Sequence, residues 1–239
     1  MTEPIPRSLD DIPGWFSPLD QLLFDLLLRR QEDTEPPGDL LELGCYLGKS
    51  AVLIGEHLRP GEQFIVCDLF GDEAPAAANA EETAEFYAGL TRPAFERNYL
   101  AFHAELPTVL QMPTDRIGAH VAAGSCRFVH VDASHLYPHV AADVRSAQAL
   151  LRPGGLVAFD DYRTMRTPGV GAAVWEAMFT LGLRPIVLTP RKWYGTWGET
   201  GPTIDYLRAQ LRTRRRWQAD DEEVAGHRLL RVAPPVEQS

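Results

Sequence analysis

Cysteine is scarce in this sequence, and the pattern of a disulfide framework is absent. The three cysteines, Cys45, Cys67 and Cys126, form no CxxC pair. Cys67 falls inside a predicted strand and Cys126 at the edge of another, where a free cysteine behaves as a small hydrophobic side chain. We therefore expect three buried, reduced cysteines. Because thiols persist in a reducing compartment, we also expect a cytoplasmic protein.

Long hydrophobic runs are also absent. No stretch approaches the roughly 20 apolar residues of a membrane-spanning helix. The first residues, MTEPIPRSLDDIPGW, are acidic and rich in proline, without the apolar core of a signal peptide. These two absences predict a protein with no membrane partner.

Positive charge is in the minority. The chain has 23 Lys and Arg against 33 Asp and Glu, a net charge of −10 and a sequence pI near 5.2. Its one basic run, RTRRRW at 212–217, is soon followed by DDEE at 220–223, and we interpret this region as a solvated helix face. Because nucleic-acid-binding surfaces are normally basic, the composition predicts no nucleic-acid partner.

What the sequence does contain is a regular alternation of strand-like and helix-like segments. The hydrophobic spacing predicts helices at 17–31, 49–58, 91–106, 114–123, 138–151, 170–183 and 203–217, and strands at 39–45, 63–70, 108–112, 127–132, 156–159, 184–197 and 227–233. This βαβ rhythm predicts a doubly wound α/β fold with a seven-stranded, mostly parallel sheet and a late hairpin-like pair.

The same pattern suggests one main domain with additions. We expect an N-terminal helical extension at 1–38 and the α/β domain at 39–235. The segment 71–106 is too long for a simple crossover, so we expect it to form a lid-like or surface insert.

Acidic residues stand at the ends of four predicted strands. Glu42 ends the first, Asp68 the second, Asp132 the fourth, and Asp160 with Asp161 the fifth, in the stretch GGLVAFDDY. In an open α/β sheet, ligands bind beyond the carboxyl ends of the strands. A single strand-end acid is commonly a helix cap, but this set at one edge predicts a functional site.

A glycine turn follows the first strand. Gly44 and Gly48 allow a tight turn and a close approach of a ligand to the backbone. Their GxxxG spacing is neither the GxGxxG of dinucleotide-binding proteins nor a P-loop. Asp68, at the end of the second strand, could accept the two hydroxyls of a ribose. A ribose site without a phosphate cradle favours S-adenosylmethionine (SAM) as the cofactor.

The acids of the fourth and fifth strands predict a cation site. Neighbouring strands lie about 4.7–4.9 Å apart, so Asp132, Asp160 and Asp161 can converge. Converging carboxylates are hard-cation ligands, and Mg²⁺ is the first candidate, with Ca²⁺ or Mn²⁺ as alternatives. The competing interpretation is one helix-capping acid and one solvated acid.

His135 lies three residues after Asp132, in VDASHLY. A histidine tethered to this corner could act as a general base near neutral pH or as a further metal ligand. We expect it to be the base.

Taken together, the segments LLELGCYLGKSAVLIGEHL, VDASHLY and GGLVAFDDY resemble the class I SAM-dependent methyltransferases. More narrowly, they are similar to the metal-dependent O-methyltransferases typified by catechol O-methyltransferase, and to the macrocin/sugar O-methyltransferase and cephalosporin-hydroxylase-like group. The resemblance covers about residues 15–197. It departs from the catechol enzymes, which carry Lys at the position of His135 and Asn at that of Asp161.

The resemblance implies roles for particular residues. The implied cofactor-binding residues are Glu42, Gly44, Tyr46, Gly48, Ser50, Asp68, Thr114, Asp115 and Asp132, with Thr114 and Asp115 at the adenine. The implied metal ligands are Asp132, Asp160 and Asp161, and the implied catalytic base is His135. It also implies a small-molecule hydroxyl substrate, on a sugar or a phenol of secondary metabolism, and a homo-oligomer.

The resulting hypothesis is a SAM- and divalent-metal-dependent O-methyltransferase. One alternative keeps SAM but makes the acids metal-free groups that orient a substrate hydroxyl or amine. Two others are a nucleotide-binding oxidoreductase, disfavoured by the missing GxGxxG, and a non-catalytic SAM-binding subunit, disfavoured by the complete acid set.

Overall fold

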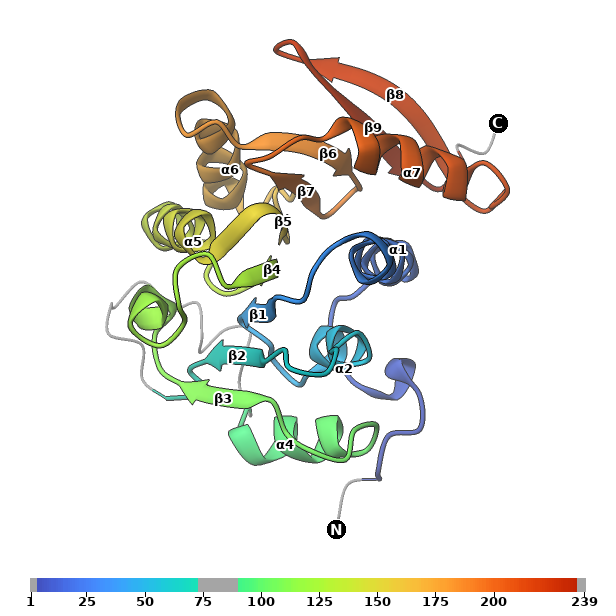
Figure 1. Cartoon of the computed structure of the whole chain (residues 1–239). Coiled ribbons are helices and arrows are strands. Elements are labelled where there is room, and N and C mark those ends of the chain that lie inside the picture. Colours follow the sequence, from blue (N-terminus) through green and yellow to red (C-terminus); the bar gives the residue numbers. More distant parts are fainter. Residues whose placement is uncertain (1–3, 73–89, 236–239) are drawn as a thin grey trace.

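The parallel sheet at the centre of the protein carries helices on both faces (Figure 1). The computed structural model describes residues 4–72 and 90–235. Within these residues, one nine-stranded sheet has the order β3-β2-β1-β4-β5-β7-β6-β9-β8. The reversal of strand order lies between β1 and β4, so the site expected of a doubly wound fold lies at their carboxyl ends. The predicted fold class is confirmed, with two strands more than predicted.

The strands follow the apolar runs of the sequence closely. They span Asp39–Leu43 (β1), Phe64–Asp68 (β2), Thr108–Gln111 (β3), Cys126–Val131 (β4), Leu151–Phe159 (β5), Arg184–Leu188 (β6), Trp193–Thr196 (β7), Gln218–Val224 (β8) and His227–Ala233 (β9). Strands β7 and β8 run antiparallel to their neighbours. Strands β1, β2 and β4 are almost wholly buried, as expected of parallel strands covered on both faces.

The helices form two layers. They span Pro18–Thr34 (α1), Lys49–Gly55 (α2), Arg92–Leu100 (α4), Tyr137–Leu150 (α5), Pro168–Thr180 (α6) and Gly201–Leu211 (α7), with 3₁₀ turns at Leu9–Asp11 (η1) and Thr114–Ala119 (η2). Helices α1, α2 and α7 cover one face, and α5, α6 and η2 cover the other (Figure 1). None of the helices in the described part of the chain is long and apolar enough to cross a membrane.

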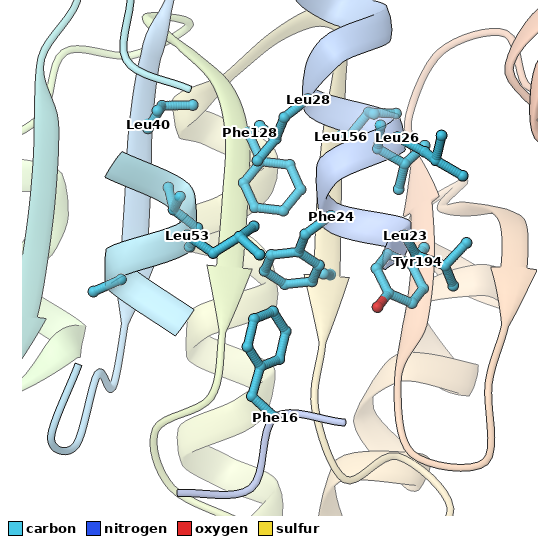
Figure 2. Packing of buried hydrophobic residues seen from close by; sticks show 14 of the residues in the cluster. Phe16, Leu23, Phe24, Leu26, Leu28, Leu40, Leu53, Phe128, Leu156 and Tyr194 are labelled. Carbon is cyan, nitrogen blue, oxygen red and sulfur yellow. The ribbon is translucent and has the colours of Figure 1, made fainter. Parts of the chain in front are cut away.

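Helix α1 lies across the middle of the sheet and belongs to its core. It begins after Ser17, whose hydroxyl accepts a hydrogen bond from the backbone of Asp20, with Pro18 at the first helical position. The Phe24 ring packs against Phe128 of β4, 5.2 Å between ring centroids, and against Phe16, 4.9 Å away (Figure 2). The N-terminal segment therefore covers one face of the sheet, with Phe24 packed against Phe128 and His130 of β4.

The amino end of the sheet is closed by a buried ion-pair network. The guanidinium of Arg127, fully buried in β4, donates to both carboxylate oxygens of Glu62, at 2.9 and 3.0 Å. It also donates to Gln31 Oε1 and to the carbonyl oxygen of His57. Glu62 accepts further bonds from Arg59 and from the backbone N–H of Gly38. Every charge in this network has its partners within the chain.

The structure corrects several predicted elements. The segment 184–197, predicted as one long strand, is the β6–β7 hairpin, because residues 189–192 turn the chain back. Strand β5 begins at Leu151 and therefore includes the RPGG that was predicted to precede it. The basic and acidic runs after α7 are a turn and strand β8, not a helix face. Predicted helix 114–123 is the shorter 3₁₀ turn η2.

Two further predictions concern the cysteines and the insert. All three cysteines are buried and free, as predicted. Burial raises the pKa of the thiols of Cys67 and Cys126 to about 12, so both stay protonated near neutral pH. Of the insert at 71–106, residues 73–89 lie outside the described residues, and the part that is described contains α4.

Candidate functional site

A cavity of about 910 Å³ opens at the carboxyl ends of β1, β4 and β5. This volume is in the range of small-molecule and cofactor sites. The predicted site residues Gly44, Tyr46, Ser50, Asp132, His135, Asp160 and Asp161 all line it. Trp15 and Tyr137 line it as well, and both are substantially exposed. Residues far apart in the sequence are therefore brought together at the strand-order reversal.

The turn after β1 requires glycine at its first position. Gly44 has φ +78°, and a Cβ there would lie 2.1 Å from the carbonyl oxygen of Asp132. The two strand ends thus touch backbone to backbone, which holds the loop of residues 44–48 beside the end of β4. Tyr46, with φ +47°, also adopts the left-handed conformation that is rare for a residue with a side chain. Such strain is concentrated at functional sites.

Asp68 fixes the shape of this loop. Its Oδ2 accepts the backbone N–H groups of Cys45, at 2.8 Å, and Tyr46, at 3.0 Å, and its Oδ1 accepts the N–H of Phe70. The residue lies at the end of β2, as predicted, but outside the lining of the cavity. The contacts found here are those of a loop-holding acid, and its role toward a ribose stays a prediction.

Glu42 is buried beneath the loop. Its Oε1 accepts the hydroxyl of Ser50 at 2.5 Å and lies 2.7 Å from Nδ1 of His130, while its Oε2 has no hydrogen-bond partner among the residues that the structure describes. Burial raises the pKa of Glu42 to about 8, despite the opposing bond from Ser50, so the carboxyl is largely protonated at neutral pH. Glu42 does not line the cavity itself, but its hydrogen-bond partner Ser50 does.

The two residues expected near the adenine are at the start of η2. Thr114 is half-buried and Asp115 is exposed, and neither lines the cavity. Gly48, at the N-cap of α2 with φ +91°, packs against Phe95 and also lies outside the lining. Their predicted cofactor contacts stay predictions.

Asp132, Asp160 and Asp161, which we call the acid corner, meet a lysine that the sequence reasoning did not identify. Lys192 Nζ lies 2.7 Å from Asp160 Oδ2 and 3.9 Å from Asp132 Oδ2. Burial opposes it, but the charges of Asp160 and Asp132 raise the pKa of Lys192, so it remains an ammonium. Burial and the charge of Asp160 raise the pKa of Asp132 well above its usual range.

Asp161 has partners of its own. Its Oδ1 accepts a bond of 2.6 Å from Arg191, and its Oδ2 lies 3.4 Å from Nε2 of His135. Although burial raises it, the bond with His135 and the charge of Arg191 hold the pKa of Asp161 below its ordinary value. Asp161 also has φ +54°, a left-handed conformation that is rare for a residue with a side chain and is concentrated at functional sites.

The acid corner does not have the form of a metal site. Among the residues that the structure describes, no group of three or more His, Cys, Asp or Glu side chains is placed to hold a metal ion. Asp160 faces an ammonium and Asp161 a guanidinium, so two of the three predicted ligands already have cationic partners. A divalent cation bound to Asp160 would face a buried positive charge 2.7 Å from the same carboxylate. The residues as arranged do not fit a divalent cation.

The missed residues Arg191 and Lys192 lie in the turn between β6 and β7. The signal was Pro190: a proline inside an apparent strand argues for an edge, a bulge or a turn. A turn at TPRK would have placed both cations beside the end of β5, which pairs with β7.

Comparison with known proteins identifies the family. A family model described as a methyltransferase domain matches residues 41–162, half of the chain, from β1 to the acid corner. A search of curated protein sequences finds no match.

Solved structures share the fold at low sequence identity. The O-methyltransferase NovP is 19% identical with a TM-score of 0.58, covering 75% of this chain and 81% of that one. CalS11, described as a TDP-rhamnose 3′-O-methyltransferase of calicheamicin biosynthesis, is 20% identical with a TM-score of 0.50, covering 76% and 80%. An O-methyltransferase from Bacillus cereus in complex with SAH is 17% identical with a TM-score of 0.51, covering 78% and 85%. With its glycine turn, strand order and matched domain, the chain belongs to the methyltransferase-domain family and has the class I SAM-dependent methyltransferase fold. The predicted resemblance to the class I methyltransferases and the prediction of an enzyme are confirmed.

Proposed function

We propose that this protein transfers the methyl group of SAM to a hydroxyl group of a small molecule, on a sugar or a phenol. One observation carries the proposal: the glycine loop expected to hold the cofactor and the His135–Asp161 pair line the same cavity. Methyl donor and acceptor can therefore meet inside one enclosed space. The matched methyltransferase domain and the SAH-bound structural neighbour support SAM as the donor.

The chemistry needs an in-line arrangement and a base. The acceptor oxygen attacks the sulfonium methyl, the carbon–sulfur bond breaks, and its electron pair stays on the sulfur of the departing S-adenosylhomocysteine. His135, half-buried in the cavity wall, takes the hydroxyl proton, and the carboxylate of Asp161 stabilises the imidazolium that results. Holding the oxygen and the methyl about 3–3.5 Å apart supplies much of the acceleration.

Aromatic side chains at the mouth of the cavity support a ring-shaped acceptor. Trp15 retains 56% exposure, and its ring centroid lies 5.5 Å from that of Tyr46 in the glycine loop. Tyr137, 43% exposed, lines the same cavity. Exposed aromatic rings cost free energy in water and are typical of surfaces that stack on sugar or phenol rings.

The metal-dependent form of the hypothesis would use Asp132, Asp160 and Asp161 as ligands to polarise the acceptor hydroxyl. The cations already paired with Asp160 and Asp161 favour the other form, in which the acids orient the acceptor without a metal. In that form Asp132, whose side chain is 29% exposed in the cavity, would accept the acceptor's hydrogen bond.

The test combines cofactor binding with a base variant. The protein is titrated with SAM by calorimetry and then incubated with isotopically labelled SAM and a panel of sugar and phenolic acceptors. His135→Ala should lower kcat by about 10²–10⁴-fold while leaving the Kd of SAM unchanged, because only proton removal is lost. The matched control is His120→Ala, an exposed histidine outside the cavity. Absence of SAM binding, or equal rates in the two variants, would contradict the proposal.

A further inference from the structure

The acid corner contains a positive charge that belongs to the chain itself. The ammonium of Lys192 lies 2.7 Å from Asp160 and 3.9 Å from Asp132, and the residue is only 1% exposed. The distance to Asp160 is that of a charge-assisted hydrogen bond. An internal cation is therefore already in place between two of the three carboxylates that a metal would need.

The ammonium is enclosed on its remaining sides. Its Nζ lies 3.0 Å from Nε2 of His130, which accepts the bond while Nδ1 faces Glu42. It also lies 5.7 Å from the Phe16 ring centroid and 5.9 Å from that of Phe24, within the range of cation–π contacts. Two aromatic rings and an imidazole thus line the position of Lys192. Figure 2 shows the two rings, Phe16 and Phe24, next to each other in the core.

The turn that carries Lys192 is fixed at both ends. The Lys192 backbone N–H donates to Thr189 Oγ1 at 2.8 Å, and its carbonyl accepts the Thr189 N–H at 2.9 Å. Asp20 of α1 then accepts the hydroxyls of Thr189 and Tyr194, at 3.0 and 2.8 Å. Because Asp20 of helix α1 anchors the hairpin on either side of the lysine, the backbone of Lys192 is held in place beside the acid corner.

We propose that Lys192 is a positioning residue that takes the place of a divalent cation in the acid corner, so that the protein needs none for methyl transfer. The inference deepens the proposed function and rests on it for the reaction itself. Lys192 and Arg191 neutralise Asp160 and Asp161, and the corner is left with Asp132 facing the acceptor. Removing the ammonium should leave two uncompensated carboxylates, and these would recruit a hard cation.

The experiment measures metal binding directly, so it does not depend on knowing the acceptor. Mn²⁺, a paramagnetic substitute for Mg²⁺, is titrated into the full-length protein and followed by electron paramagnetic resonance. We expect no stoichiometric site in the wild type at up to about 1 mM Mn²⁺, the weak end of protein cation sites. Lys192→Met should gain one Mn²⁺ site per chain, with a Kd at least about a hundredfold below this limit, because a buried unit charge about 4 Å away no longer repels the ion.

Two control variants assign the new site. Lys49→Met removes another lysine of the same cavity, one that pairs with Asp10 and not with the acid corner, and should not gain Mn²⁺ binding. Adding Asp160→Asn to Lys192→Met should abolish the gained site, since one carboxylate ligand is lost. Circular dichroism and SAM titration confirm that each variant is folded.

The outcomes separate the two proposals. A stoichiometric Mn²⁺ site in the wild type that disappears in Asp160→Asn would overturn the role of Lys192, even if methyl transfer is confirmed. A folded Lys192→Met variant that binds no Mn²⁺ would overturn it as well. Should that variant not fold, the wild-type titration alone decides. Once an acceptor is found, we expect EDTA to change the wild-type rate by less than about twofold, whereas a loss of tenfold or more would contradict the inference.

Discussion

The two ends of the parallel sheet both bury charge, but they do so differently. At the amino end, Arg127 and Glu62 are fully enclosed, and each makes several bonds to side chains and backbone within the chain. At the carboxyl end, the acid corner holds three carboxylates against the two cations Arg191 and Lys192, and Asp132 retains 29% exposure in a cavity. At the amino end, both charged groups have their hydrogen-bond partners within the chain. At the carboxyl end, the carboxylate of Asp132 faces the cavity.

This difference distinguishes structural charge from functional charge. A buried ion pair whose hydrogen bonds are all met has no capacity left for a ligand, whereas an incompletely compensated acid beside a cavity can still bind one. Two left-handed residues with side chains, Tyr46 and Asp161, line the cavity at the carboxyl end, whereas another, Ala225, lies in the β8–β9 turn away from it. Changes at the two ends should therefore have different consequences for stability and for cofactor binding.

The largest effect on stability is expected from Arg127→Leu at the amino end. Removing the guanidinium leaves the carboxylate of Glu62 buried with only part of its compensation, which should cost about 3–5 kcal/mol in the free energy of unfolding. The matched control is Arg231→Leu in β9, an exposed pair with Asp220 that should cost less than about 1 kcal/mol. Urea denaturation measures both. Equal costs in the two variants would mean that the buried network contributes no more to the free energy of unfolding than an exposed ion pair does.

A smaller loss of stability, with a larger loss of function, is expected from Gly44→Ala at the carboxyl end. The new Cβ would clash with the carbonyl oxygen of Asp132, and the alanine would have to adopt a left-handed conformation. Together the two effects should lower the free energy of unfolding by about 3 kcal/mol. Gly61→Ala is the control, because Gly61 has φ +85° but open space around its Cβ position, so only the strain of about 1 kcal/mol applies. SAM affinity should fall in Gly44→Ala and not in Gly61→Ala. A Gly44→Ala variant that binds SAM with wild-type affinity would show that the close contact between the ends of β1 and β4 is not needed for SAM binding.

Much of the fold could be predicted from hydrophobic periodicity, because parallel strands are short, buried apolar runs and their helices have one apolar face. Strands β1, β2 and β4 begin and end within one or two residues of the predicted bounds. The failures have local causes. The β6–β7 hairpin has apolar residues on both sides of its turn, so the two strands read as one. Strand β8 is rich in acids because it lies at the sheet edge, where charge protects against pairing with other chains.

The grouping of the acids was predicted, but their compensation by Arg191 and Lys192 was missed, although Pro190 signalled the turn that carries both cations. Strand-end positions and parallel topology were sufficient to place Asp132, Asp160 and Asp161 at one cavity. Lys192 escaped notice because it reaches them through a turn that depends on long-range contacts with Asp20, far away in the sequence. Carboxylates at strand ends therefore predict where a site lies, while the identity of the cation depends on elements that pack from elsewhere.

The smallest of the three expected effects is a loss of stability at acid pH that comes from Glu62 at the amino end. The bonds from Arg127 and Arg59 outweigh the opposing effect of burial and lower the pKa of Glu62 from 4.5 to about 2. A carboxyl whose pKa is depressed in the folded state stabilises the protein above its unfolded pKa, and this contribution is lost as the pH falls through the folded pKa. Wild type should thus lose about 2 kcal/mol relative to Glu62→Gln between about pH 4.5 and pH 2, since the glutamine cannot ionise. Urea denaturation of both proteins across this range measures the difference. If the difference in stability between wild type and Glu62→Gln stayed constant across this range, the acid sensitivity would come from other groups. The carboxylate of Glu62 would then not be fully compensated by its partners, and the contrast with the acid corner would fail.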